Sequence, residues 1–173
     1  MSDQPFSPPA FSDQGICDGG GSHDHELCVR QALDAAEVAC LQQGVKLTAL
    51  RRRVLELVWQ SRRPVGAYTL LDALKGDGQS AQPPTVYRAL DFLMAHGFVH
   101  KLESLNAFLG CSHPGAPHAG QFLICRDCGR TEELEDTTIA ETIVASAARH
   151  GFSVLRQSVE IEGRCSDCQQ ALV

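Results

Sequence analysis

The sequence predicts an α+β fold made of an N-terminal winged helix-turn-helix and a small α/β domain that contains four cysteines. Apolar residues recur at helical spacing through residues 30–97, and a short apolar hairpin follows them. Beyond residue 120 the pattern alternates between strand-like and helical segments, and two Cys-x-x-Cys pairs stand among them. A chain of 173 residues has room for two such small domains.

Four helices and a hairpin are expected in the first domain. Glycine, proline and an N-capping threonine punctuate the helical pattern, and proline is tolerated in the first turn of a helix. The helices are expected from Arg30 to Gly44, from Thr48 to Ser61, from Gly66 to Gly76 and from Pro83 to Gly97. The segments 98–102 and 107–109 are expected to pair as the hairpin, or wing.

The fourth helix is expected to turn polar side chains away from the core. Its apolar positions fall on one face, which leaves Thr85, Tyr87 and Arg88 nearer the outer face. In a winged helix-turn-helix, this helix can lie in the major groove of double-stranded DNA. There Arg88 can contact guanine, and Tyr87 can contact a phosphate or a methyl group. A helical bundle that binds other proteins is the alternative.

The charge distribution favours the first domain as the binding surface for a polyanion. The net charge is −6, but residues 31–103 carry +2, while residues 1–30 and 104–173 carry −4 each. Arginines cluster in the basic segment at Arg51-Arg52-Arg53 and Arg62-Arg63. A polyanion is expected to bind there, and a solvated helix face is the alternative explanation of the clusters.

Two Cys-x-x-Cys pairs predict a closed metal site in the second domain. They are Cys125 with Cys128 and Cys165 with Cys168. Each pair is expected at a tight turn, and four thiolates in a tetrahedron are typical ligands of a structural zinc ion. Strands are expected over 121–125, 130–134 and 153–163, with a helix over 137–150. A domain this small, with few aromatic residues, usually depends on zinc or dimerisation for its stability.

Residues 1–29 are expected to form a disordered N-terminal tail, because they are rich in Gly, Ser, Pro and Asp. The tail contains four residues of metal-binding type, Cys17, His23, His25 and Cys28. They are either a further metal site or chance ligands in a flexible segment.

Several functional classes are disfavoured by the sequence. No apolar run is long enough for a membrane span and the first residues lack a signal-peptide pattern, so a cytoplasmic protein without membrane partners is expected. In a reducing compartment, eight cysteines favour metal binding over disulfides. An enzyme with a small organic substrate is not expected. The sequence motifs of zinc deaminases are missing, and a thiol redox enzyme would need a thioredoxin-like context.

The sequence resembles the ferric uptake regulator family over roughly residues 30–170, and within it the zinc uptake regulators. The resemblance lies in residues 83–93 (PPTVYRALDFL), in residues 97–101 (GFVHK) and in the two Cys-x-x-Cys pairs. It implies a dimeric, metal-activated transcriptional repressor of zinc uptake genes. The implied parts are a winged-helix DNA-binding domain at 30–104, a hinge at 105–120 and a dimerisation and metal-binding domain at 121–173.

The resemblance also assigns roles to single residues by position. Arg88 matches a base-contacting arginine of the family, and Tyr68 matches a DNA-contacting tyrosine. The four cysteines of the Cys-x-x-Cys pairs match its structural zinc ligands. The regulatory zinc site is matched by His100, Cys111, His118 and Glu133, which gives two zinc ions per chain. One sulfur, two imidazoles and one carboxylate suit tetrahedral zinc, whereas donors of oxygen and nitrogen alone suit iron or manganese.

Two alternatives remain open at the regulatory site. The interval from Cys111 to His118 is shorter than is usual in zinc regulators and contains His113, so either histidine can be the ligand. The same fold also serves sensors of iron or peroxide, and Cys111 is the residue that favours zinc. Because the ligands come from both halves of the chain, metal binding is expected to fix the orientation of the two domains and thereby to favour DNA binding.

Overall fold

The computed structural model describes residues 25–61, 63–112, 114, 120–134 and 136–171. The chain divides into two compact units, Met1–Ala116 and Pro117–Val173. Four of the predicted metal-binding residues, Cys17, His23, His113 and His118, lie outside the described residues. Each unit is described by itself below.

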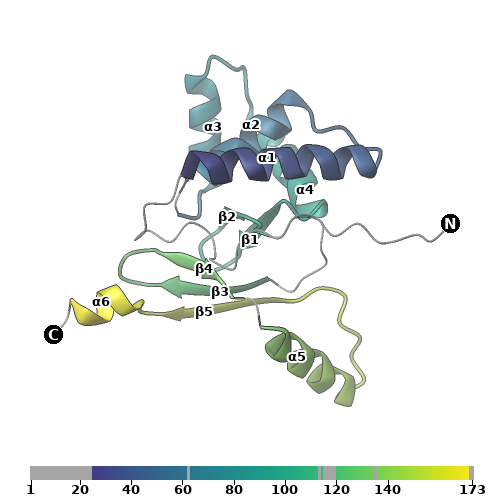
Figure 1. Cartoon of the computed structure of the whole chain (residues 1–173), viewed down its shortest axis with the longest axis vertical. Coiled ribbons are helices and arrows are strands. Elements are labelled where there is room, and N and C mark those ends of the chain that lie inside the picture. The colour runs from purple at the N-terminus through teal and green to yellow at the C-terminus, as the bar shows by residue number, and fades with distance from the viewer. Residues whose placement is uncertain (1–24, 62, 113, 115–119, 135, 172–173) are drawn as a thin grey trace. The chain divides into compact units, whose positions relative to one another are not determined.

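Four helices and a two-stranded wing form the first unit (Figure 1). They are α1 (His25–Gln42), α2 (Ala49–Gln60), α3 (Ala67–Gly76), α4 (Pro83–Ala95), β1 (Val99–Leu102) and β2 (Ala107–Gly110). The strands β1 and β2 pair antiparallel, and Val65 adds a bridge to Phe108. This order of elements confirms the predicted winged helix-turn-helix.

The helix boundaries in the first unit follow the expected signals. Thr48 caps α2, because its hydroxyl oxygen accepts a hydrogen bond from the N–H of Arg51 at 3.4 Å. Prolines occupy the first turn of α4. Gly44 and Gly97 follow α1 and α4 with φ angles of 66° and 70°, a left-handed conformation that glycine adopts without strain.

Helix α1 begins earlier than the sequence pattern indicated. Its first residue is His25, not Arg30, and Val29 is buried on the same helical stripe as Leu33 and Ala36. The prediction that the N-terminal tail reaches residue 29 is therefore wrong for residues 25–29. Apolar packing against the core extends the helix through this stretch.

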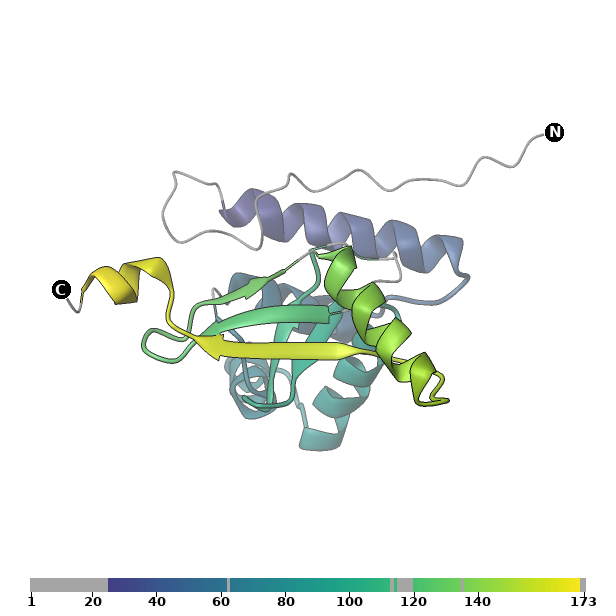
Figure 2. The ribbon, with the colours of Figure 1, turned by 90° about the horizontal axis from the view of Figure 1, so that it is seen from below.

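A three-stranded sheet and two helices form the second unit. They are β3 (Gly120–Cys125), β4 (Thr131–Glu133), α5 (Thr137–Arg149), β5 (Ser158–Gly163) and α6 (Ser166–Gln170). The strand order is β4-β3-β5, with β4 antiparallel and β5 parallel to β3. Figures 1 and 2 show β5 running along β3, and the parallel register places Cys125 opposite Gly163. The two Cys-x-x-Cys segments therefore emerge at the same end of the sheet.

Two parts of the second unit differ from the prediction. The last strand begins at Ser158 rather than at residue 153, because its partner β3 begins at Gly120, directly opposite Ser158. Leu155, in the part of the predicted strand that does not form, is 97% exposed. Helix α6 was not predicted, since its short polar sequence has no apolar periodicity.

Asp136 stabilises the start of α5. Its carboxylate oxygen accepts hydrogen bonds from the N–H groups of Thr138 at 2.8 Å and Ile139 at 3.4 Å. We expect Asp136→Ala to lower the free energy of unfolding by about 0.5–2 kcal/mol, because these N–H groups lose their acceptor. Thermal unfolding measures the loss, and Asp136→Asn, which keeps an acceptor oxygen, should cost clearly less. If Asp136→Ala and Asp136→Asn lose the same free energy of unfolding, the stabilisation comes from the negative charge at the helix N-terminus and not from the hydrogen bonds.

Candidate metal centres and nucleic-acid interface

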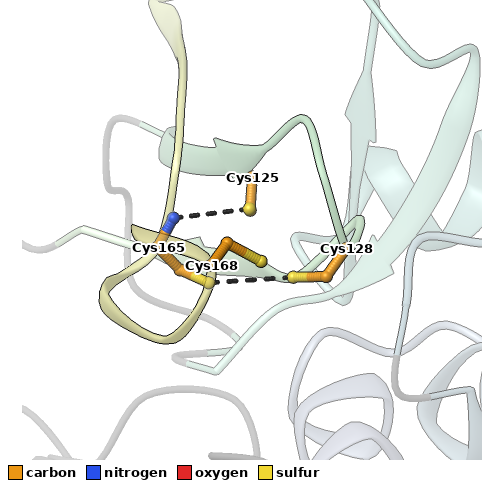
Figure 3. A group of neighbouring side chains, drawn as sticks. All are labelled: Cys125, Cys128, Cys165 and Cys168. Atoms are coloured by element: carbon orange, nitrogen blue, oxygen red, sulfur yellow. Dashed lines mark hydrogen bonds between the residues drawn. The ribbon is translucent and has the colours of Figure 1, made fainter. Parts of the chain in front are cut away.

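The four Cys-x-x-Cys cysteines converge in the second unit, as predicted. Cys125 ends β3, Cys128 lies in the turn after it, and Cys165 and Cys168 lie at the start of α6. Figure 3 shows the four side chains turned toward one another. Their sulfur atoms all lie within 4.8 Å of each other, and those of Cys128 and Cys165 are 3.8 Å apart.

Backbone hydrogen bonds shape this cluster. The N–H of Arg126 donates to the carbonyl oxygen of Gly163 at 2.9 Å, which joins the turn after β3 to the end of β5. The N–H of Gly129 donates to the carbonyl oxygen of Cys125 at 2.9 Å and closes that turn. The N–H of Cys165 donates to the sulfur of Cys125 at 3.3 Å (Figure 3). The sheet register and these hydrogen bonds therefore bring the two cysteine turns together.

The surroundings of the cluster act in opposite directions on two of its thiols. N–H groups of Cys165 and Cys128 hold the pKa of the Cys125 thiol down at about 6. The neighbouring sulfurs of Cys165 and Cys128 raise the pKa of Cys168, because its thiol shares hydrogen bonds with them. A cation bound between the four sulfurs would stabilise all of them as thiolates at once. Four converging cysteine sulfurs fit a tetrahedral zinc ion, which this chain's Cys125, Cys128, Cys165 and Cys168 would hold.

Two ion pairs cross between the cysteine turns, and the sequence pattern did not indicate them. The guanidinium of Arg164 lies 2.8 Å from the carboxylate of Asp127, and that of Arg130 lies 3.4 Å from Asp167. Each aspartate sits inside one Cys-x-x-Cys turn, and its arginine belongs to the other side of the cluster. All four side chains are partly solvent-exposed, so each pair contributes at most about 1 kcal/mol.

His100 and Cys111 come together in the first unit. His100 lies in the middle of β1, and Cys111 directly follows β2. Cys111 is almost fully buried, at 1% exposure, and its N–H donates to the carbonyl oxygen of Phe98 at 3.0 Å. Its sulfur lies within 4.8 Å of an imidazole nitrogen of His100. The wing thus brings together two candidate ligand atoms, one sulfur and one imidazole nitrogen.

Glu133, the predicted carboxylate ligand, belongs to the second unit. It is the last residue of β4 and stands opposite Phe122 of β3. Its side chain is buried, at 6% exposure. The predicted histidine ligand, His118 or His113, lies outside the described residues.

The predicted DNA-binding residues stand on the surface of the first unit. Tyr87 and Arg88 are exposed on α4, Thr85 is half-buried there, and Tyr68 is 68% exposed at the start of α3. Among the described residues, none forms a hydrogen bond or ion pair with the Arg88 guanidinium. Core residues of α4, such as Val86 and Leu90, lie on the opposite face.

The arginine cluster 51–53 has a structural role that its sequence did not indicate. The guanidinium of Arg51 lies over the ring of Phe92, 3.6 Å from its centroid. Arg52 pairs with Glu37 at 2.6 Å, and Arg53 pairs with Asp77 at 2.7 Å. These contacts join α2 to α1, to α4 and to the residue after α3. The positive charges of Arg52 and Arg53 are thus already matched within the unit.

No helix in the described part of the chain is long and apolar enough to cross a membrane.

The comparisons with known proteins agree with the fold of each unit. Residues 42–162 match the model of the Ferric uptake regulator family. The chain is 39% identical over 140 residues to the zinc uptake regulation protein of Escherichia coli K12, covering 80% of this chain and 82% of that protein. It is 29% identical over 137 residues to the ferric uptake regulation protein of the same strain, covering 76% and 90%.

A solved structure of a zinc uptake regulator complexed with zinc and DNA is also similar. The sequence identity is 37%, the TM-score is 0.78, and the match covers 83% of this chain and 97% of that one. The family match over residues 42–162 includes α2 to α4, the strands of the wing with His100 and Cys111, and the first Cys-x-x-Cys turn, whereas Cys165 and Cys168 lie beyond its end. The chain belongs to the ferric uptake regulator family.

Proposed function

We propose that the chain is a zinc-responsive transcriptional repressor that binds operator DNA as a homodimer and controls zinc uptake genes. The observation that carries the proposal is the buried Cys111 sulfur beside the His100 imidazole, on the wing of a DNA-binding fold. The relatives named as zinc uptake regulators support zinc as the metal and DNA as the partner. We also propose that the protein is cytoplasmic and that it is not an enzyme.

The proposed DNA contacts come from α3 and α4. Arg88 has an exposed guanidinium with no ion-pair or hydrogen-bond partner in the described part of the chain, which leaves it available for a bidentate contact to guanine. Tyr87 and Thr85 lie on the same helix and suit contacts to the sugar-phosphate backbone or to a thymine methyl group. Tyr68, exposed at the start of α3, suits a phosphate contact. Two copies of this surface in a dimer suit a pseudo-palindromic operator.

Dimerisation is proposed to use the second unit. Helix α5 has no buried residue, although Ile139, Ile143 and Val144 give it an apolar side. Ile161 of β5 is 41% exposed and Val144 is 47% exposed. A single copy therefore leaves apolar area in water that a second copy can cover.

Two zinc ions per chain are proposed. Cys125, Cys128, Cys165 and Cys168 hold the structural ion, while His100, Cys111, Glu133 and either His118 or His113 hold the regulatory ion. When bound at the regulatory site, zinc supplies a cross-link between ligands of the two units. Cys111 binds as the thiolate and His100 as the neutral imidazole, so protons compete with the metal at both residues. A thiolate in this set favours zinc over iron or manganese.

Changing Arg88 tests the proposed DNA surface. We expect Arg88→Ala to weaken binding to the operator by roughly 5- to 150-fold at saturating zinc, the range for losing a good base contact of about 1–3 kcal/mol. The operator is first selected from random duplexes with the native protein. Fluorescence anisotropy then measures the dissociation constants for the operator and for an unrelated duplex.

The matched control is Lys75→Ala, which removes one exposed positive charge from the last turn of α3. It should change both affinities by less than Arg88→Ala does. Arg88→Ala should also bring the operator and the unrelated duplex closer in affinity, because a base contact carries sequence information. Equal effects of the two variants on both duplexes would contradict the placement of α4 in the major groove.

A further inference from the structure

One residue of β2 has no room for a side chain. A Cβ atom added to Gly110 would lie 2.5 Å from Cε2 and 2.6 Å from Nε1 of the Trp59 indole ring. Carbon atoms in proteins do not approach so closely, and the rigid ring cannot move aside as a flexible side chain can. Trp59 is itself buried, at 5% exposure. The indole ring and the Gly110 backbone are therefore packed directly on each other.

This contact stands immediately before the proposed metal ligand Cys111. On the strand side, the N–H of Cys111 donates to the carbonyl oxygen of Phe98 at 3.0 Å. On the helix side, Trp59 packs on the residue that precedes it. The backbone of Cys111 is thus fixed from two directions, and its sulfur is held within 4.8 Å of the His100 imidazole.

Trp59 also connects the backbone at Gly110 and Cys111 to α4, the helix that carries the proposed DNA-binding residues Thr85, Tyr87 and Arg88. It lies near the end of α2, on the core face that Val54, Leu55 and Val58 share. Helix α2 packs against both β2 and α4. A displacement of β2 at Gly110 would therefore press on α2, the element that supports α4. Close-packed interiors transmit such displacements because they have low compressibility.

We propose that Trp59 is a positioning residue for Cys111. Its indole ring, packed on Gly110, sets where the Cys111 sulfur stands and links that sulfur through α2 to α4. The inference rests on the proposed function, because it assumes that Cys111 binds the regulatory zinc. It adds a residue from α2 to a site whose ligands all lie on or beyond the wing.

A double-mutant cycle tests this role. The full chain, with zinc retained at the four cysteines, is titrated with zinc in competition with a chromophoric chelator. We expect Trp59→Leu and Gly110→Ala each to weaken binding at the regulatory site by about 10-fold or more, the usual cost of losing a supporting contact around a metal ligand. The combination Trp59→Leu with Gly110→Ala should regain most of the affinity, because the smaller leucine makes room for the added methyl group.

Leu74→Ala is the matched control for a general loss of core packing. Leu74 is fully buried in α3, in the same core as Trp59, and it is not part of the wing. It should lower the melting temperature as Trp59→Leu does but leave the zinc affinity within about twofold of the native value, since of these two residues it is Trp59 that packs on Gly110, next to Cys111. If Trp59→Leu does not fold, Trp59→Phe provides the same comparison with a smaller change.

The outcomes separate this inference from the proposed function. If Trp59→Leu changes the zinc affinity no more than Leu74→Ala does, Trp59 is a core residue only, and the inference is overturned. The inference is also overturned if the losses of zinc affinity in Trp59→Leu and Gly110→Ala simply add in the double variant. The proposed function fails in a different way: Cys111→Ser would then keep the native zinc affinity, whatever the Trp59 variants do.

Discussion

Cys111→Ser is expected to remove the dependence of DNA binding on zinc. A serine hydroxyl does not ionise near neutral pH and is a poor zinc ligand, so the regulatory site would lose its only sulfur donor. The operator affinity in saturating zinc should fall to that of the zinc-depleted native protein. Coupling energies of about 1–3 kcal/mol correspond to a loss of roughly 5- to 150-fold. Anisotropy titrations with and without zinc measure it.

The control for this variant is Cys40→Ala. Cys40 is buried among the core residues of α1, and burial raises the pKa of its thiol, so it behaves as an apolar side chain and not as a thiolate. Its removal should leave the response to zinc intact. Cys111→Ser should still be folded, dimeric and loaded at the four-cysteine site. A variant that still binds the operator only in the presence of zinc would refute the sensory role of Cys111.

Cys125→Ser is expected to have the larger structural effect. Neighbouring N–H groups lower the pKa of the Cys125 thiol to about 6, and its sulfur accepts the hydrogen bond that joins the two cysteine turns. Without it, the remaining three sulfurs form an incomplete site. Binding of structural zinc is part of the folding free energy of small domains, so the second unit should lose its cooperative unfolding transition along with its zinc.

Metal analysis, circular dichroism and sedimentation measure this outcome together. The variant should lose its structural zinc, lose strand content and dissociate to monomers. The first unit has its own core and should keep its helices. Retention of the zinc and of the dimer in Cys125→Ser would contradict the structural assignment of the four cysteines.

The elements that carry chemistry were largely predictable from the sequence. The prolines at residues 83–84 and the glycine at 97 mark the bounds of α4, and local backbone preferences alone decide them. The two Cys-x-x-Cys pairs predicted a shared metal site, because the spacing of two thiols within one tight turn is likewise a local property of the sequence. The parallel pairing of β3 with β5 then explains how two distant segments meet.

Features that depend on tertiary packing were not predictable. The early start of α1 depends on a core stripe that includes Val29, and the late start of β5 depends on where β3 begins. The contact between Trp59 and Gly110 joins residues far apart in the chain, and neither residue type signals it. Likewise, nothing in the sequence of Arg52 and Arg53 shows that acidic residues from neighbouring elements neutralise them.

The most direct test of a two-zinc, metal-activated repressor combines metal analysis with operator binding on one preparation. The native protein is treated with increasing concentrations of a mild chelator, and zinc per chain and operator affinity are measured at each step. We predict two zinc ions per chain at the start, and loss of the first together with DNA binding while the dimer persists. Tight operator binding that survives removal of the first zinc, or a chain that never holds more than one, would contradict the account.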